Sequence, residues 1–168
     1  ECTEQGVVVF NTPGANANAV KELVLCGLLL ASRGVVPGIR FADSQTEVSG
    51  YAELSKLMEQ EKKRFKGNEI AGKTLGVVGL GAIGSLVAEM AIGLGMEVKG
   101  FDPALSVEAA WRLPNQVERI ENLSVLVAGS DYISLHLPVL ESTRKLIDAS
   151  MFAAMSQGTC LLNFARDE

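Results

Sequence analysis

The sequence has few of the side chains on which several common functions depend. It contains one histidine, three cysteines and one tryptophan in 168 residues. The cysteines form an odd number without metal-ligand spacing, so we expect reduced thiols, no metal site and a cytoplasmic location. The net charge of −5 and the lack of a basic stripe argue against nucleic acid or an anionic membrane as a partner. Uninterrupted apolar runs such as 24–31 are too short to span a bilayer.

Glycine, in contrast, is abundant, and three of the 17 glycines form one motif. Gly79, Gly81 and Gly84 follow an apolar run at 74–78 and lead into a helical apolar pattern at 83–94. In a dinucleotide-binding βαβ unit, the first glycine permits a tight turn and the second lets a pyrophosphate approach the backbone. The third lets the helix pack closely on the strand. A glycine-rich turn without a ligand is the alternative, and the flanking strand and helix disfavour it.

The residue after the next predicted strand indicates which dinucleotide binds. The strand at 97–101 is followed by Asp102, whose carboxylate can accept hydrogen bonds from the adenosine ribose hydroxyls. The same carboxylate would repel the additional phosphate of NADP, and residues 103–106 carry no positive charge to offset it. Arg112 lies too far along the chain to be assigned that role. We therefore expect NAD as the cofactor, although an acid before proline is also typical of a turn.

Helix and strand patterns alternate along the chain and predict an α/β fold. We expect a doubly wound, mostly parallel Rossmann sheet, incomplete at its C-terminal end, which a long helix and a peripheral helical arm precede. The predicted strands cover 7–10, 74–78, 97–101, 132–135 and 159–163. The predicted helices cover 20–31, 51–65, 83–94, 123–128, 143–147 and 150–155. The charged helix over 51–65 is expected to be peripheral, and the segment 35–67 that contains it is a candidate dimerisation arm.

Ligands bind at the carboxyl ends of the strands in open α/β sheets, and three polar residues follow predicted strands there. Arg166 could bind a substrate carboxylate through two hydrogen bonds, or could be a surface side chain. His136, the only histidine, could act as a general acid–base, but its apolar setting is more typical of a packed side chain. Thr143, which follows Pro138, could reach the cofactor or cap a helix.

At these residues the sequence resembles the D-isomer-specific 2-hydroxyacid dehydrogenases. The matching segments are 75–84, Asp102-Pro103, 134–138 with Thr143, and 163–166. The opening segment 11–23 is similar to the start of the cofactor domain in the D-3-phosphoglycerate dehydrogenase branch. In this family the cofactor domain is inserted into the substrate domain. The resemblance therefore implies that residues 1–10 end a substrate-domain segment and that residues 11–168 form an NAD-binding domain, truncated before its last helix and strand.

The resemblance also implies a role for each matched residue. The backbone of Gly81, Ala82 and Ile83 would face the pyrophosphate, and Asp102 would hold the ribose. Residues around Pro138 and Thr143 would line the nicotinamide side of the cofactor, His136 would be a cofactor-pocket residue, and Arg166 would bind the substrate. The expected cofactor-binding residues are Gly79, Gly81, Ala82, Ile83, Gly84, Asp102, His136, Pro138, Thr143, Phe164 and Ala165, and the expected catalytic residue is Arg166.

The resemblance implies a parent protein that oxidises 3-phospho-D-glycerate with NAD in serine synthesis and forms a homodimer through this domain. The family's catalytic histidine and its glutamate follow the matched arginine, and Asp167 stands where the family has glycine. This chain alone is therefore expected to bind NAD(H) and to turn over little or nothing. Dehydrogenases of glycerate (hydroxypyruvate), lactate or formate are alternatives, as is an NADH-sensing, corepressor-like binding module. The third glycine and the proline after Asp102 argue against a methyltransferase that uses S-adenosylmethionine.

Overall fold

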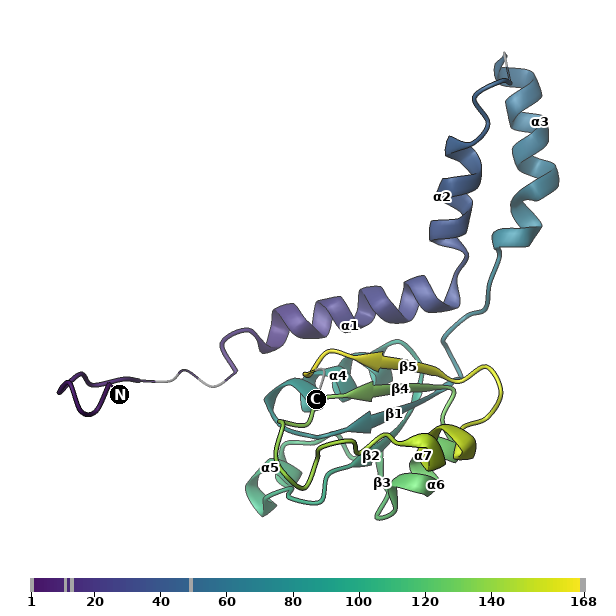
Figure 1. The fold of residues 1–168 in the computed structure, drawn as a ribbon. Helices are drawn as coiled ribbons and strands as arrows, with labels where there is room; N and C mark the ends of the chain where they lie inside the picture. Colours follow the sequence, from purple (N-terminus) through teal and green to yellow (C-terminus); the bar gives the residue numbers. More distant parts are fainter. Residues whose placement is uncertain (1, 11, 13, 49, 167–168) are drawn as a thin grey trace.

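The computed structural model describes residues 2–10, 12, 14–48 and 50–166, and its centre is a five-stranded parallel sheet (Figure 1). The strands are β1 (Thr74–Val78), β2 (Glu97–Phe101), β3 (Val117–Arg119), β4 (Tyr132–Leu135) and β5 (Cys160–Asn163). Their order is β3-β2-β1-β4-β5, so the chain runs outward from β1 to β3 and then returns to the other side of β1. This reversal is the switch point of a doubly wound sheet, and the predicted Rossmann fold is confirmed.

Helices cover both faces of the sheet. On one face α1 (Ala17–Ser32) packs beside α4 (Ala82–Gly93), and on the other α6 (Leu123–Ala128) packs beside α7 (Ala149–Ala154). Leu75 and Val77 of β1 belong to the first core, whereas Val78 belongs to the second. This alternation follows the two-residue period of a strand. A central parallel strand is buried on both faces, which explains why β1 has no charged residue.

The long helix expected over 20–31 is present as α1, and its buried residues Val24 and Leu28 face the sheet core. Leu23, although apolar and next to Val24, is 57% exposed. Within the described ranges no single helix is long and apolar enough to cross a membrane. Only α1 and α2 (Val35–Asp43) taken together have the length and composition of a membrane-spanning segment, and a bend of 66° separates them.

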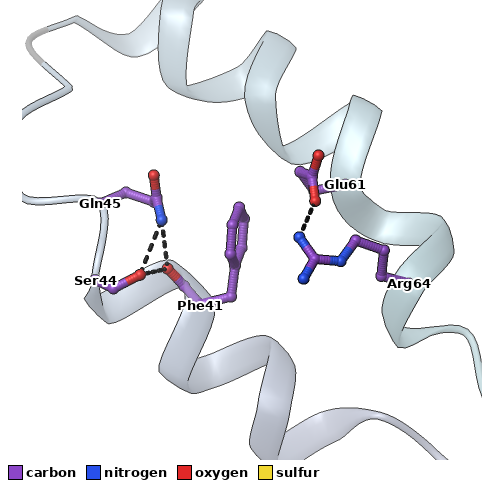
Figure 2. Close-up of polar contacts among 5 residues, drawn as sticks. All are labelled: Phe41, Ser44, Gln45, Glu61 and Arg64. Atoms are coloured by element: carbon purple, nitrogen blue, oxygen red, sulfur yellow. Dashed lines mark hydrogen bonds and ion pairs between the residues drawn. The ribbon is translucent and has the colours of Figure 1, made fainter.

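The segment 35–65, here called the arm, projects away from the sheet (Figure 1). It consists of α2, α3 (Tyr51–Glu61) and the short 3₁₀ helix η1 (Lys62–Phe65). The rings of Phe41 and Phe65 lie 5.4 Å apart between centroids, and the Arg64 guanidinium lies within 6 Å of both. Arg64 also forms an ion pair with Glu61 (Figure 2). The predicted arm helix is confirmed over 51–61, although its last turn tightens into η1.

Hydrogen bonds from polar side chains close the α2 end of the arm (Figure 2). The Gln45 amide donates to the carbonyl oxygen of Phe41 at 3.1 Å and to the Ser44 hydroxyl at 2.9 Å. The Ser44 hydroxyl donates to the same carbonyl at 2.7 Å. The same carbonyl also accepts from the backbone N–H of Ser44 at 3.2 Å, so backbone and side-chain donors together satisfy it in the last turn of α2.

Two predictions about secondary structure were wrong, and two short elements were missed. Residues 7–10 form no strand, because no described strand pairs with them, and their side chains are 56–88% exposed. Residues 143–147 form no helix, because a turn covers 141–145 and Lys145 has a φ of +53°. The three-residue edge strand β3 and the short helix α5 (Val107–Trp111) were not predicted at all.

The junction of β1 and α4 yields a test of packing. A Cβ added at Gly84 would lie 1.8 Å from the Gly79 carbonyl oxygen, whereas one added at Gly93 of the same helix would meet nothing within 4 Å. We expect Gly84→Ala to lower the free energy of unfolding by about 2 kcal/mol or more, because backbone atoms must move. Gly93→Ala should leave it unchanged or raise it by up to about 1 kcal/mol.

Urea unfolding monitored by circular dichroism measures both variants. Equal effects of the two substitutions would contradict the close contact between α4 and the end of β1.

Candidate functional site

The residues selected from the sequence all follow strands at the carboxyl edge of the sheet. The strand order places the segments after β2, β1, β4 and β5 next to one another in that sequence along the edge. Asp102 follows β2, the glycine turn follows β1, His136 and Pro138 follow β4, and Arg166 follows β5. The carboxylate of Asp102 therefore lies at one end of the edge, the backbone of the glycine turn in the middle and the guanidinium of Arg166 at the other end.

The glycine turn between β1 and α4 is shaped by the strands on either side of it. Gly79 has a φ of +93°, and a Cβ there would lie 2.9 Å from backbone atoms of His136 and Leu137. Only glycine adopts this conformation readily and fits this contact. Gly81 differs, because a Cβ there would meet no protein atom within 4 Å. Glycine at position 81 is therefore not required by packing within the chain.

The amino-terminal end of α4 has the features of an anion site. Its N-cap is Gly81, which offers no side chain to accept from the N–H groups of the first turn. Ala82 is exposed at this end, whereas Ile83 packs against the core. Unpaired N–H groups and the positive end of the helix dipole both favour a phosphate here. The open space at Gly81 gives such a group access to the backbone. The residues present thus fit the pyrophosphate of a dinucleotide.

The carboxylate of Asp102 is held by two backbone N–H groups. Its Oδ2 accepts from Leu80 at 2.8 Å, and its Oδ1 accepts from Ala104 at 2.9 Å. Each oxygen retains a lone pair for a further donor. Asp102 also borders a cavity of about 480 Å³ that extends to Trp111 and Arg119. The turn role and the ribose role predicted for this residue are therefore compatible with each other.

His136 follows β4, and its ring is half-buried with a fully buried Nδ1. Its Nε2 lies 2.8 Å from the Ser134 hydroxyl oxygen, and its buried Nδ1 has no hydrogen-bond partner in the described part of the chain. Burial lowers the pKa of His136 from 6.5 to about 4, so the ring is neutral at pH 7. A half-buried, neutral ring fits the interpretation of a packed side chain and not that of a general acid.

A second cavity, of about 460 Å³, opens at the ends of β4 and β5. Val78, Leu135 and Leu161 provide its apolar side, and Pro138, Thr143, Lys145, Ala165 and Arg166 also line it. The structure thus brings together four residues that were selected from separate sequence motifs. Lys145 was not predicted, and its positive φ, unusual for a residue other than glycine, gave no signal in the sequence.

Thr143 holds the loop between β4 and α7 in place. Its hydroxyl donates to the carbonyl oxygen of Pro138 at 2.7 Å and accepts from the N–H of Leu140 at 2.8 Å. No helix begins at Thr143, so the helix-cap interpretation is wrong. The hydroxyl instead closes a turn, which the small polar side chains of serine and threonine often do.

The loop that carries Arg166 is shaped by Asn163, a residue that sequence analysis missed. The Asn163 side chain accepts from the N–H of Ala165 at 3.0 Å and donates to the carbonyl oxygen of Arg166 at 2.9 Å. An asparagine at a strand end was the available signal, because its amide commonly closes a turn two residues on. The ring of Phe164 packs against α1 instead. A Cβ added at Gly27 of that helix would lie only 3.2 Å from the ring. Its side chain therefore belongs to the core.

Two further polar groups are the partly buried thiol of Cys160, at the amino end of β5, and the N-cap of α7. Burial raises the pKa of the Cys160 thiol, so thiolate chemistry there is disfavoured. The Ser150 hydroxyl and the Met151 N–H lower the pKa of Asp148, which caps α7. Among the described residues, no group of three or more His, Cys, Asp or Glu side chains could hold a metal ion.

Comparison with known proteins places this geometry in a family. The sequence profile of the D-isomer specific 2-hydroxyacid dehydrogenase, NAD binding domain, matches residues 36–168. The chain is 37% identical over 164 residues to the D-3-phosphoglycerate dehydrogenase of Methanocaldococcus jannaschii, covering 98% of the chain and 28% of that protein. It is 40% identical over 163 residues to the hydroxypyruvate reductase of Thermotoga maritima, covering 97% of the chain and 47% of that protein. The chain thus spans between about a quarter and a half of these relatives.

Solved structures agree with the sequence comparison. The apo form of D-mandelate dehydrogenase from Rhodotorula graminis superposes with a TM-score of 0.78 at 32% identity, covering 98% of this chain and 46% of that one. The apo structure of D-lactate dehydrogenase from Escherichia coli superposes with a TM-score of 0.76 at 26% identity, covering 99% and 47%.

The half-buried histidine predicts a pH dependence of stability. Because its folded-state pKa of about 4 lies below the usual 6.5, the unfolded chain binds the proton more tightly between these values. The stability that neutral His136 confers is complete above pH 6.5 and is lost as pH falls through 4, a change of about 3 kcal/mol. His136→Gln, which cannot take up the proton, should show a flatter fall in unfolding free energy from pH 7 to 4.

Urea unfolding at intervals across that pH range gives the unfolding free energy of both proteins. Carboxylates that titrate in the same range change this free energy equally in the wild type and the variant. Parallel curves would contradict the half-buried, neutral histidine.

Proposed function

Because the chain belongs to the D-isomer-specific 2-hydroxyacid dehydrogenases, as the NAD-binding domain of that family, we propose that it serves a D-3-phosphoglycerate dehydrogenase. Such a protein oxidises 3-phospho-D-glycerate to 3-phosphohydroxypyruvate, the first step of serine synthesis. The similarity to relatives of that name in Methanocaldococcus jannaschii, rat and human supports the proposal. Hydroxypyruvate reductase is the second candidate, because the Thermotoga maritima protein of that name is 40% identical to the chain.

The observation that carries the dehydrogenase role is the series of groups along the carboxyl edge of the sheet. In our proposal Asp102 accepts from the adenosine ribose, and the backbone of Gly81, Ala82 and Ile83 faces the pyrophosphate. The cavity beside Pro138 and Thr143 would take the nicotinamide side of the cofactor. The uncapped α4 amino terminus and the open space at Gly81 support this direction of binding.

At the far end of the edge, we propose that Arg166 binds the carboxylate of the 2-hydroxyacid. The bound NAD supplies the hydride acceptor. A guanidinium can donate two parallel hydrogen bonds to a carboxylate and can polarise the adjacent 2-carbonyl group that forms as the hydride leaves. Asn163 would fix the backbone of the loop that carries this side chain. Ala165 lines the same cavity as Arg166, whereas Phe164 does not line it and packs its ring against α1.

We further propose that the chain forms a homodimer. The helices α1 and α2 expose Leu29, Leu30, Val35, Val36 and Ile39, of which Ile39 is 56% exposed. The arm that contains α2 packs mainly on itself and projects from the sheet (Figure 1). Apolar side chains grouped on two successive helices favour a second copy of this chain that buries them at a dimer interface.

The remaining parts of the proposal follow from the sequence. Residues 1–10 would end a substrate-domain segment, and residues 11–168 would form the cofactor domain. The protein would act in the cytoplasm on a small-molecule substrate, and the charge of −5 disfavours a nucleic acid or anionic membrane as partner.

Cofactor binding is the first test of this function. Trp111 is the only tryptophan, so transfer of its excitation energy to bound NADH provides a direct signal. We expect saturable binding of NADH and weaker binding of NADPH, because the additional phosphate would lie against Asp102. Gly81→Ala should weaken NADH binding at least about tenfold, equivalent to about 1.4 kcal/mol, by filling space needed for the pyrophosphate.

The same variant should remain folded and lose no more than about 1 kcal/mol of unfolding free energy, because the added methyl group meets no protein atom and only the preference for glycine over alanine at an N-cap is lost. Gly93→Ala, at the far end of α4, is the matched control and should bind NADH normally. Equal affinities for NADH and NADPH would exclude the ribose role of Asp102, and normal NADH binding by Gly81→Ala would exclude the glycine turn as the pyrophosphate site.

The dimer is tested by sedimentation velocity over a range of concentrations. We expect the wild-type chain to sediment with twice the mass of a monomer. Ile39→Glu should weaken this association at least about tenfold, because a charge would be buried at the interface. Val107→Glu is the matched control, since Val107 is also exposed but lies on α5. A monomer at every concentration, or equal effects of the two substitutions, would contradict the proposal.

A further inference from the structure

The carboxylate of Asp102 continues the hydrogen-bond ladder between β1 and β2 beyond the end of the strands. The last backbone bond of this ladder runs from the N–H of Gly79 to the carbonyl oxygen of Phe101 at 2.8 Å. The next donor along the chain, the N–H of Leu80, finds the Asp102 side chain in place of a backbone carbonyl, also at 2.8 Å. A side chain 22 positions away thus determines where the middle residue of the glycine turn lies.

The side chain of Leu80 is fixed from the same strand. It is 3% exposed, and a Cβ added at Gly100 of β2 would lie 2.8 Å from its Cδ1. Leu80 is therefore held over β2 by its side chain and by its N–H together. Gly81, which follows directly, forms the N-cap of α4 and faces the space that fits a pyrophosphate.

We propose that Asp102 is a positioning residue for the glycine turn in addition to its role toward the ribose. The inference rests on the proposed function, because it concerns how the same dinucleotide is bound. One carboxylate would orient the backbone that meets the pyrophosphate and would accept from the ribose hydroxyls. Recognition of these two parts of the cofactor is then coupled through a single side chain.

The coupling has a consequence for cofactor preference. If Asp102 acted on the ribose alone, its removal would leave the affinity for the pyrophosphate intact and would relieve the repulsion of NADP. With the coupling, removal also leaves the partly buried Leu80 N–H without its acceptor. Asp102→Ala therefore weakens the binding of NADH and of NADPH, and does not convert the domain to NADP.

The decisive measurement separates the two roles with a modified ligand. An NADH analogue whose adenosine ribose lacks both hydroxyls keeps the pyrophosphate but cannot reach Asp102 through the ribose. We expect Asp102→Ala to bind this analogue about tenfold more weakly than the wild type does, since a hydrogen bond to a charged acceptor is lost. Asp102→Asn retains one acceptor and should bind the analogue within about threefold of the wild type.

A readout without ligand follows the turn directly. Amide hydrogen exchange at Leu80, measured by NMR, should be slow in the wild type and at least about tenfold faster in Asp102→Ala, because the N–H loses its acceptor. Asp131→Ala is the matched control. The Asp131 carboxylate accepts from the N–H of Thr74 at 2.9 Å, which is the same kind of bond at the opposite end of β1. That substitution should change neither analogue affinity nor exchange at Leu80.

The outcomes distinguish this inference from the proposed function. If the wild type and Asp102→Ala bind the analogue equally, or if exchange at Leu80 is unchanged, the positioning role is overturned. If the wild type binds neither NADH nor the analogue, the proposed function fails, and the exchange measurement alone decides whether Asp102 orders the turn.

Discussion

Close contact of Gly79 with its surroundings is the constraint on which the rest of the structure depends. Its N–H bonds to the end of β2, its backbone lies against that of His136 after β4, and its carbonyl oxygen touches Gly84 of α4. Three strands and one helix are therefore fixed relative to one another at a single residue. Because ligands in doubly wound sheets bind where the strand order reverses, the same contact fixes the candidate cofactor site.

Much of this arrangement could be predicted because it is encoded locally. The glycine motif, the apolar strand before it and the acid after the next strand each give a signal within a few residues. The side chain that orients Leu80 is different, since it acts across 22 positions and its effect depends on the register of β1 with β2. The sequence does not show which groups the fold brings together across such a separation, so the ribose role and a local turn role of Asp102 could be inferred, but not its bond to Leu80.

The errors have a common physical origin in missing or unexpected tertiary partners. The apolar residues 7–10 have strand-forming side chains, but a strand also requires a neighbour, and none of the described strands pairs with them. β3 is the opposite case, since its three residues become a strand through pairing with β2. Threonine is a residue type that often caps helices, yet the hydroxyl of Thr143 bonds to Pro138 and Leu140 within a loop. The cavity beside Arg166 arises from two such loops and could not be foreseen from either.

The contact between Gly27 and Phe164 joins two parts of the molecule that are distant in sequence. With no side chain on Gly27, the aromatic ring at the end of β5 lies directly against the backbone of α1. A helix is stiff along its axis, and a packed interior transmits displacement with little compression. Because α1 leads directly into the arm, this contact connects the helix that carries the arm to the loop of Arg166. A side chain at position 27 would push these two parts of the molecule apart.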